Sequence, residues 1–280
     1  MIDLHTHTTA SDGRCTPSEL VARASAAGVT VLGVTDHDTV AGVAAAAVAC
    51  RTAGIVFVPG IEITAVRDTA DVHVLGYFVD AASPALQNFL AEQRRRRVSR
   101  VREMIQRLAG LGIYLDADAI LKPGIDDPSK AVGRPWIASA LVAGGHVATK
   151  NDAFDRFLSR GRPAYVPRTG ASPDDVIARI HDARGLASIA HPALIGRDEW
   201  LHDFADADVD ALEVFHPDHD PDATARYMAL ATRLGLAVTG GSDYHADESH
   251  GATGPGSVSL PREHYDRLVR LKPDTTAGRT

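Results

Sequence analysis

The histidines of this chain fall in short clusters with carboxylates. His5 and His7 stand two residues apart in the opening segment MIDLHTHTTASDG, and Asp243 and His245 repeat that spacing in GGSDYH. Residues two apart on a strand point to the same side, so each pair can present two groups to one point. Imidazoles and carboxylates without cysteine are ligands of Zn²⁺, Mn²⁺ or Fe²⁺. The pattern therefore indicates a transition-metal site, in which Glu62 could bridge two ions.

Polar side chains of this kind accompany every predicted strand. Strands are predicted at residues 2–5, 29–34, 55–64 and 72–79, and in the later segments LASIAHP, ALEVFHP and LAVTGGSDYH. The polar residues that close these strands, follow them or, for His73, lie within one are His5, His7, Asp12, Asp36, His37, Asp38, Glu62, His73, His191, His216, Asp243 and His245. In α/β barrels the carboxyl ends of the strands form the active-site face. A lone histidine is more often a hydrogen-bonded structural residue, but the shared position of this set favours one active site.

Helices are predicted between these strands, which is the pattern of a parallel α/β sheet. The first begins with Thr16 as the N-cap, Pro17 at the first helical position and Glu19 completing a capping box, and it extends to about Ala27. Three further helices of this kind are predicted at 40–53, 173–184 and 222–234.

The middle of the chain has a different, mostly helical pattern. A long helix carries one apolar face made of Val98, Val101, Ile105 and Leu108. Shorter helices are predicted at 116–121, 133–144 and 150–160. We therefore predict an α/β barrel-like domain at 1–83 and 163–272, interrupted by a small helical insertion at 84–162. The tail at 273–280 is predicted to be disordered.

Composition excludes several classes of protein. No apolar run reaches the ~20 residues needed to span a bilayer, and the opening residues lack a signal-peptide pattern. The two cysteines, Cys15 and Cys50, form no CxxC motif, so neither a disulfide framework nor a thiolate metal site is expected. The formal net charge of -7 argues against a broad basic face that coats nucleic acid. We expect a cytoplasmic protein with no membrane partner and no stable nucleic-acid complex.

Six motifs resemble, in order, those of the polymerase and histidinol phosphatase (PHP) family of metal-dependent phosphoesterases: DLHTHTTASDG, VTDHD, PGIEIT, HVLGY, AHP and GSDYH. The resemblance implies a distorted seven-stranded β/α (TIM-like) barrel, which agrees with the predicted order of elements. It also implies two to three divalent transition-metal ions per chain, which would be Mn, Fe or Zn.

The resemblance assigns ligands to three ions. His5, His7, Glu62 and Asp243 would bind the first, Glu62, His73 and His191 the second, and Asp12, His37 and His245 the third. Asp36 and Asp38 flank His37 and could orient ligands from behind, although Asp38 could equally cap the following helix. Asp3 is a further candidate for such an orienting role.

The resemblance also implies a substrate class. Histidinol phosphatases of the family commonly have histidine where Asp12 stands. That difference, together with the helical insertion, resembles the subgroup that acts on nucleoside 3′,5′-bisphosphates and 5′-phosphorylated short RNA. The expected reaction is attack on phosphorus by a hydroxide that bridges two metal ions. Glu62, Asp243 and His216 are the expected catalytic residues.

Candidate substrate contacts are His216 and three arginines. Arg134, in GRPWIA of the insertion, resembles an arginine that binds substrate phosphate in this subgroup, and Arg197 and Arg168 are weaker candidates. His216 could bind phosphate, protonate the leaving group or cap a turn. The arginine run at 94–97 is either a solvated helix face or an RNA contact. Trp136 either stacks on a base or belongs to a core.

Two other classes remain open. One is a different metal-dependent hydrolase, such as a cyclic phosphodiesterase, a histidinol-phosphate-like phosphatase or an amidohydrolase. The other is an inactive PHP module with a structural role, against which the complete set of nine expected ligands argues. The amidohydrolase alternative predicts amide hydrolysis without phosphate release.

Overall fold

The structure of the protein is a computed structural model that describes residues 1–127, 132–247 and 252–272. The chain forms two compact units, Met1–Phe89 with Ala171–Thr280 (unit 1) and Leu90–Gly170 (unit 2). The predicted domain boundaries, after residues 83 and 162, stay a prediction. The tail predicted at 273–280 lies outside the described residues.

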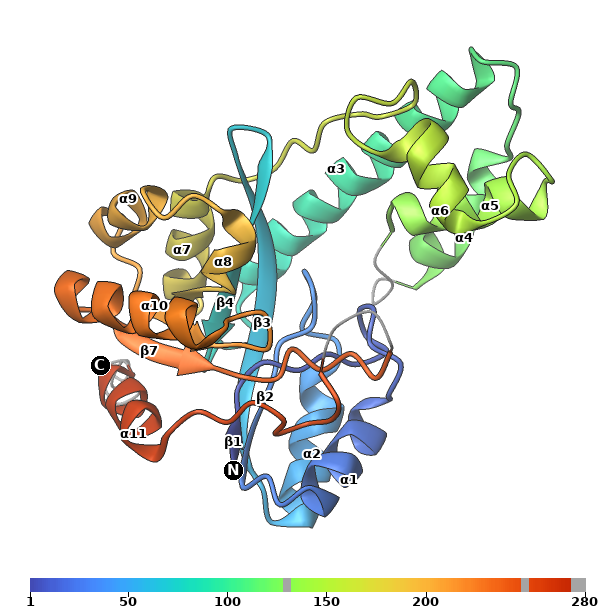
Figure 1. The fold of residues 1–280 in the computed structure, drawn as a ribbon. Helices are drawn as coiled ribbons and strands as arrows, with labels where there is room; N and C mark the ends of the chain where they lie inside the picture. Colours follow the sequence, from blue (N-terminus) through green and yellow to red (C-terminus); the bar gives the residue numbers. More distant parts are fainter. Residues whose placement is uncertain (128–131, 248–251, 273–280) are drawn as a thin grey trace. The chain divides into compact units, whose positions relative to one another are not determined.

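Unit 1 is built on a seven-stranded sheet in which each strand pairs with the next one along the chain (Figure 1). The strands are β1 (Ile2–Asp3), β2 (Val31–Val34), β3 (Val56–Arg67), β4 (Ala70–Tyr77), β5 (Leu186–Ile189), β6 (Ala211–Phe215) and β7 (Ala237–Gly240). The strands predicted from the sequence are therefore all present, at similar positions.

The sheet is nearly closed into a barrel by the segments that follow β1 and β7. The backbone N–H of Leu4 donates to the carbonyl of Gly240 at 3.2 Å, and that of Asp243 donates to the carbonyl of His5 at 2.8 Å. Thr6 and Tyr244 form a parallel bridge one step further along. The predicted β/α barrel architecture is thereby confirmed.

One strand runs against the expected parallel sheet. β4 is antiparallel to both β3 and β5, so the prediction of a parallel sheet is wrong at this strand. Only Asp68 and Thr69 separate β3 from β4, and both adopt positive φ, at 48° and 67°. A two-residue connection with positive φ at both positions makes a tight hairpin, whereas a parallel crossover needs a dozen residues or more.

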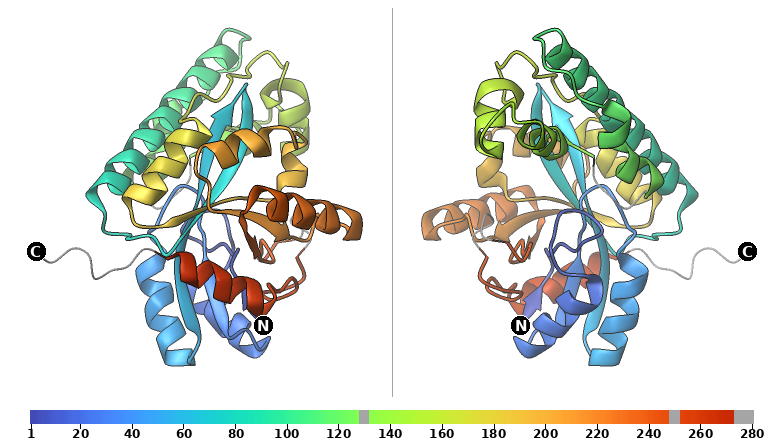
Figure 2. Two further views of the ribbon diagram at one scale, coloured as in Figure 1. Left: turned by 90° about the vertical axis from the view of Figure 1, so that its left-hand side faces the viewer. Right: turned by 90° about the vertical axis from the view of Figure 1, so that its right-hand side faces the viewer.

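Helices surround the strands of unit 1 (Figure 2). They are α1 (Pro17–Ala26), α2 (Val43–Ala53), α7 (Pro173–Asp182), α8 (Pro192–Ile195), α9 (Trp200–Asp206), α10 (Pro221–Leu234) and α11 (Arg262–Leu271). The Thr16–Glu19 capping box begins α1 as predicted, and Gly54 in the left-handed conformation ends α2. α2 packs on β2 and β3, α7 on β3 to β5, α10 on β6 and β7, and α11 on β7. Cys15 and Cys50 are buried in the apolar core and form no disulfide.

Unit 2 is a helical cluster with its own apolar core. It contains most of α3 (Pro84–Ala109), then α4 (Ala117–Asp126), α5 (Arg134–Ala143), α6 (Lys150–Ala153) and a π-helical turn, η1 (Phe154–Leu158). The predicted face of the long helix packs into this core: Val101, Ile105 and Leu108 are buried and Val98 is partly buried. Trp136 is partly buried and packs against this core. This contact supports a role in the core for Trp136 over stacking on a base.

Three arginines of the run on α3 contact other residues of unit 2. Arg95 and Arg96 pair with Glu92, one helical turn earlier. Arg94 donates to the backbone carbonyls of Gly124 and Asp127. These contacts are typical of a helix surface, and RNA binding by the run stays a prediction. Among the described residues, no helix is long and apolar enough to cross a membrane.

Candidate metal centre

All nine predicted metal ligands belong to unit 1, at the carboxyl edge of its parallel strands. His73 reaches the same edge although it lies near the beginning of β4, because β4 runs in the opposite direction. It pairs there with Thr64 of β3, two residues beyond Glu62. The reversal of β4 therefore places a histidine from the start of a strand beside ligands from the ends of the others.

The buried carboxylate of Glu62 lies at the middle of the cluster, and its two oxygens face different histidines. Oε2 lies 3.3 Å from Nε2 of both His5 and His7. The same oxygen is 3.0 Å from Nδ1 of His37. Oε1 faces the other way, and the atoms nearest to it are Nδ1 of His73 at 2.8 Å and Nε2 of His191 at 3.1 Å. The two oxygens of Glu62 thus face different groups of histidines, which is the arrangement that the predicted bridging role requires.

The first predicted ligand set converges on one point. His5, His7, Glu62 and Asp243 offer ligand atoms within 4.8 Å of one another. Oδ1 of Asp243 lies 3.2 Å from His5 Nε2 and 3.1 Å from His7 Nε2. The two histidines of the HxH pair thus point to the same side, as their spacing predicts. Asp243 has φ 51°, a left-handed conformation that aspartate and asparagine adopt more readily than most residues.

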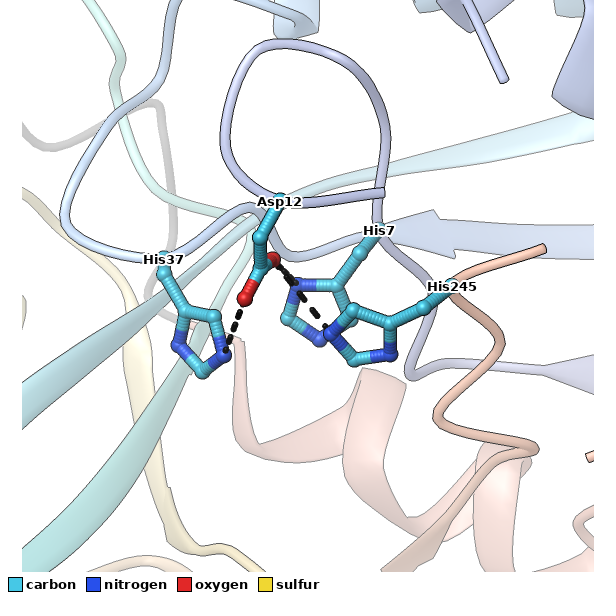
Figure 3. A group of neighbouring side chains, drawn as sticks. All are labelled: His7, Asp12, His37 and His245. Carbon is cyan, nitrogen blue, oxygen red and sulfur yellow. Dashed lines mark ion pairs between the residues drawn. The ribbon is translucent and has the colours of Figure 1, made fainter. Parts of the chain in front are cut away.

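The third set also converges, with one addition. Asp12, His37 and His245 lie together, and His7 joins them (Figure 3). Oδ1 of Asp12 is 3.3 Å from Nε2 of His245 and 3.8 Å from Nδ1 of His7. Oδ2 of Asp12 is 3.7 Å from Nε2 of His37. His7 therefore faces two sets, one with each ring nitrogen, which the sequence did not indicate.

His37 likewise lies between two sets. Its Nε2 faces Asp12, but its Nδ1 faces Glu62 in a group that also contains His73. The resemblance grouped Glu62 with His73 and His191 instead, and both of those rings do face Oε1 of Glu62. In the predicted second set, His73 and His191 therefore lie beside Oε1 of Glu62, whereas His37 lies beside Oε2.

Several buried polar atoms of the cluster lack a hydrogen-bond partner among the described residues, which suits a site for cations. His7 Nε2, His37 Nδ1 and Asp243 Oδ1 are buried, yet none has a hydrogen-bond partner in the part of the chain that the structure describes. Buried polar atoms are normally paired. A divalent ion satisfies imidazole nitrogens and carboxylate oxygens together, so these residues fit a metal centre.

The electrostatics of the cluster point the same way. Burial lowers the pKa of His7, but the carboxylates of Asp243 and Glu62 outweigh it and raise that pKa to about 10. Burial by itself raises the pKa of Glu62, but the surrounding imidazoles, His37 first, hold it well below its usual value. Burial lowers the pKa of His37 to about 3, although Glu62 opposes this shift. The carboxylates thus stay ionised and favour the protonated form of His7, so the cluster attracts positive charge.

Carboxylates behind the cluster position the loops that carry it. Asp36 accepts hydrogen bonds from Thr8 and Ser11, close to Asp12. Asp3 accepts from the backbone N–H and hydroxyl of Ser242, beside Asp243. These contacts support the orienting roles suggested for Asp36 and Asp3.

The helix-cap alternative for Asp38 is wrong. Its carboxylate accepts from the backbone N–H of Thr64 at 2.9 Å and from the Thr64 hydroxyl at 3.2 Å, so it ties the β2 loop to β3. The following helix, α2, has Gly42 as its N-cap and no side-chain cap. Asp38 lies four residues before this N-cap, which is too far for it to cap the helix.

Glu213 was not among the site residues predicted from the sequence. This wholly buried residue of β6 has one oxygen 2.9 Å from Nδ1 of His5, and the other accepts the backbone N–H of His191 at 2.7 Å. Burial raises the pKa of Glu213, but His5 outweighs it and the pKa is lowered overall. A charged residue between apolar neighbours in ALEVF was the one available signal.

His216 lies against the first set. Its Nε2 is 3.4 Å from Oδ2 of Asp243, and its Nδ1 accepts the backbone N–H of Asp218 at 3.1 Å. His216 therefore does cap a turn, with the nitrogen that faces away from Asp243. Because Nδ1 is an acceptor, the proton of the neutral ring resides on Nε2.

The three candidate arginines lie in different places. Arg197 follows α8 in unit 1, its side chain is 61% exposed and it pairs with Glu199 at 3.6 Å. Arg134 is the first residue of α5 in unit 2, with its guanidinium 5.6 Å from the ring centre of Phe154. Arg168 also belongs to unit 2. Their roles in substrate binding stay predictions.

Comparisons with known proteins agree on one family. A family model described as the PHP domain matches residues 3–131. The chain is 37% identical to the 5′-3′ exoribonuclease Rnm of Salmonella typhimurium, over 87% of this chain and 84% of that protein. It is 35% identical to the 3′,5′-nucleoside bisphosphate phosphatase of Chromobacterium violaceum, over 96% of this chain and 98% of that one.

A solved structure shows the same fold. It is described as a candidate metal-dependent phosphoesterase from Bifidobacterium adolescentis, and it is 32% identical with a TM-score of 0.81. The alignment covers 98% of this chain and 96% of that one. The likeness thus extends over both units.

Proposed function

Because the chain belongs to the PHP family and is a metal-dependent phosphoesterase, we propose that it hydrolyses phosphate esters of nucleotides. The substrates we propose are nucleoside 3′,5′-bisphosphates, which would lose the 3′-phosphate, and 5′-phosphorylated short RNA, which would release nucleotides. The observation that carries this proposal is the 35% identity over 96% of the chain to a phosphatase named for the first of these substrates. Asp12, at the position where histidinol phosphatases of the family commonly have histidine, supports the same subgroup.

We propose that two to three divalent ions, Mn, Fe or Zn, bind in the cluster. The proposed ligands are His5, His7, Asp12, His37, Glu62, His73, His191, Asp243 and His245. When bound, such ions neutralise phosphoryl oxygens and lower the pKa of a bound water. The chain itself contributes an ionised Glu62 and Asp243, whose carboxylates keep the centre anionic and therefore selective for cations.

We assign proton transfer to His216. Its Nε2–H faces Asp243, while the bond from Asp218 to Nδ1 keeps the ring in one orientation. A positioned imidazole that carries its proton on the nitrogen facing the centre can donate it to a leaving oxygen or bind a phosphoryl oxygen. His216 is only 4% exposed, so its ring has little freedom to turn away.

Arg134, with Arg168 and Arg197 as further candidates, is proposed to bind the second phosphate of the substrate. A guanidinium binds phosphate through two parallel hydrogen bonds. Arg134→Ala should raise KM by about 10-fold with a smaller change in kcat, the range for losing one charged hydrogen-bond partner. The matched control is Arg156→Ala, since Arg156 also lies in unit 2 against an aromatic ring, that of Phe157. Equal KM values for the two variants would contradict the role of Arg134.

The experiment that tests the function is a phosphate-release screen with Mn²⁺. The compounds are adenosine 3′,5′-bisphosphate, 5′-phosphorylated dinucleotides, histidinol phosphate, a cyclic phosphodiester and simple sugar phosphates. The proposal predicts the highest kcat/KM for the first two. Preference for histidinol phosphate or the cyclic diester would contradict it, and amide hydrolysis without phosphate release would favour an amidohydrolase. We propose a cytoplasmic location, as expected from the sequence, and a small phosphorylated molecule as the partner.

A further inference from the structure

Glu213 joins two parts of the proposed metal centre that lie far apart in the sequence. In the sequence, Glu213 is separated from His5 by 208 positions and from His191 by 22 positions. Each oxygen has one of these partners: Oε1 is 2.9 Å from His5 Nδ1, and Oε2 accepts the His191 backbone N–H at 2.7 Å. All three residues are buried, with Glu213 and His5 at 0% exposure. Water therefore does not replace either bond.

The bond to His5 determines which nitrogen faces the first ligand set. An ionised carboxylate accepts hydrogen bonds only, so Nδ1 of His5 must carry a proton. The lone pair for metal binding is then on Nε2, which lies 3.3 Å from Oε2 of Glu62 and 3.2 Å from Oδ1 of Asp243. This is the arrangement in which a second carboxylate orients a ligand histidine and increases its basicity.

The bond to His191 acts on the backbone. His191 has φ 26° and ψ 63°, a left-handed conformation that L-residues rarely adopt. It is followed by Pro192, which begins α8 and contributes no N–H of its own. The hydrogen bond to Glu213 therefore stabilises this conformation at the residue itself, and it leaves His191 Nε2 3.1 Å from Oε1 of Glu62.

Glu213 is not placed to be a ligand itself. It does form a group with His5 and His216 that could hold an ion. However, each of its oxygens already accepts a hydrogen bond, and the ring atom it faces on His5 is the one opposite the first ligand set. We propose that Glu213 is a positioning residue shared by two metal positions, one that orients the ring of His5 and the backbone of His191 together. This inference rests on the proposed metal centre.

The test is metal affinity in Glu213→Gln. A glutamine has nearly the same volume but only one acceptor oxygen, so it cannot accept from both partners at once. Titration calorimetry with Mn²⁺ and with Zn²⁺ should show Kd values about 10–100-fold higher than in the wild type, as for other residues that orient ligand histidines. At limiting metal, the variant should also hold fewer ions per chain, because both positions are affected.

Asp210, which directly precedes the same strand β6, provides a matched control. Its carboxylate also joins a histidine to a backbone N–H, those of His181 and Ala187, both at 2.8 Å. His181 is not a member of the metal cluster. Asp210→Asn should therefore change stability while leaving the Kd of either ion within about threefold of the wild type. An unchanged Kd in Glu213→Gln, or the same loss in Asp210→Asn, would overturn the inference.

A measurement on the wild type covers the case in which Glu213→Gln does not fold. In the Zn²⁺-loaded protein labelled with ¹⁵N-histidine, Nδ1 of His5 should carry a proton that exchanges slowly with water. A proton on Nε2 of His5 instead would overturn the inference. These readouts do not depend on the ester hydrolysed. A failed substrate screen with normal metal binding would contradict the proposed function alone, whereas a wild type that binds neither ion would overturn both.

Discussion

The carboxylate of Asp36 accepts both the backbone N–H and the hydroxyl of Thr8, at 2.7 and 2.8 Å. Both residues are buried, and Ser11 adds a third bond at 2.8 Å. These hydrogen bonds connect the loop that carries Asp12 to the segment that follows β2 and carries His37. The conformation of this loop therefore depends on a residue 28 positions further along the chain.

Asp36→Ala should destabilise the protein by about 1–3 kcal/mol, because it leaves the buried N–H of Thr8 without an acceptor. It should also weaken binding of the ion assigned to Asp12, His37 and His245. Urea unfolding and metal content per chain are the measurements. Ser11→Ala, which removes one partly buried bond to the same carboxylate, is the control and should cost less than about 1 kcal/mol. Equal losses in the two variants would argue against a role for Asp36 in holding the loop.

Gly241→Ala should disturb the closure of the barrel. A Cβ at this position would lie 2.3 Å from the backbone nitrogen of His5 and 2.7 Å from Oδ1 of Asp3. Backbone atoms cannot move aside cheaply, so we expect a loss of about 1–3 kcal/mol and weaker metal binding by His5. Gly254→Ala is the control, since within the described part of the chain no heavy atom beyond its own neighbours lies within 4 Å of its Cβ position. Thermal unfolding that gave the same midpoint for both variants would refute this expectation.

Asp243→Asn should abolish phosphate release with little change in fold. Asparagine tolerates the left-handed conformation at this position, but it lacks the charge that faces His5 and His7. We expect kcat/KM to fall by more than about 100-fold, beyond the range for residues that only orient ligands. The control is Asp218→Asn, an exposed carboxylate 3.8 Å from Nδ1 of His216. Phosphate release at the wild-type rate in Asp243→Asn would remove the basis for the assigned ligands.

The pair of His181 and Asp210 should make stability depend on pH. The hydrogen bond to Asp210, at 2.8 Å, raises the pKa of His181 above its usual value. The protonated histidine is thus favoured in the folded state, and its contribution is complete below the unfolded pKa of ~6.5. It is lost as the pH rises through the raised, folded pKa.

His181→Asn should therefore reduce the unfolding free energy at pH 5.5 more than at pH 9. Since the side chain of His181 is 35% exposed, the difference should stay below about 1 kcal/mol. Urea unfolding at the two pH values measures it, and 1 M NaCl should reduce it by screening. A larger loss at the higher pH would contradict the sign of the shift.

Local features of the chain were readable from sequence. The capping box at Thr16 and Glu19, the glycine that ends α2 and the apolar face of α3 are all present in the structure. Each depends on residues within one or two helical turns of one another, so the sequence contains both partners at a readable spacing. The HxH pair belongs to the same class: both rings approach Oδ1 of Asp243, as the two-residue spacing predicts, although β1 itself ends at Asp3.

Two other features were not readable from the sequence, one local and one that depends on a distant partner. The direction of β4 follows from a hairpin at Asp68 and Thr69, residues whose positive φ no pattern in the sequence announced. From the sequence, Asp38 could equally cap the following helix or orient a metal ligand, because both roles suit an aspartate at that position. Only its hydrogen bond from Thr64, which is distant in the sequence, excludes the helix cap.

The sequence by itself determined the residue types of the predicted ligands, their order and the barrel edge on which they gather. Only the tertiary structure decided which atoms face one another: His7 between two ligand sets, His37 against both Asp12 and Glu62, and Glu213 behind His5. The physical reason is that strand periodicity and capping are short-range, whereas the direction of a ring nitrogen depends on hydrogen bonds that span up to 208 residues of chain. Those bonds exist only once the barrel has closed.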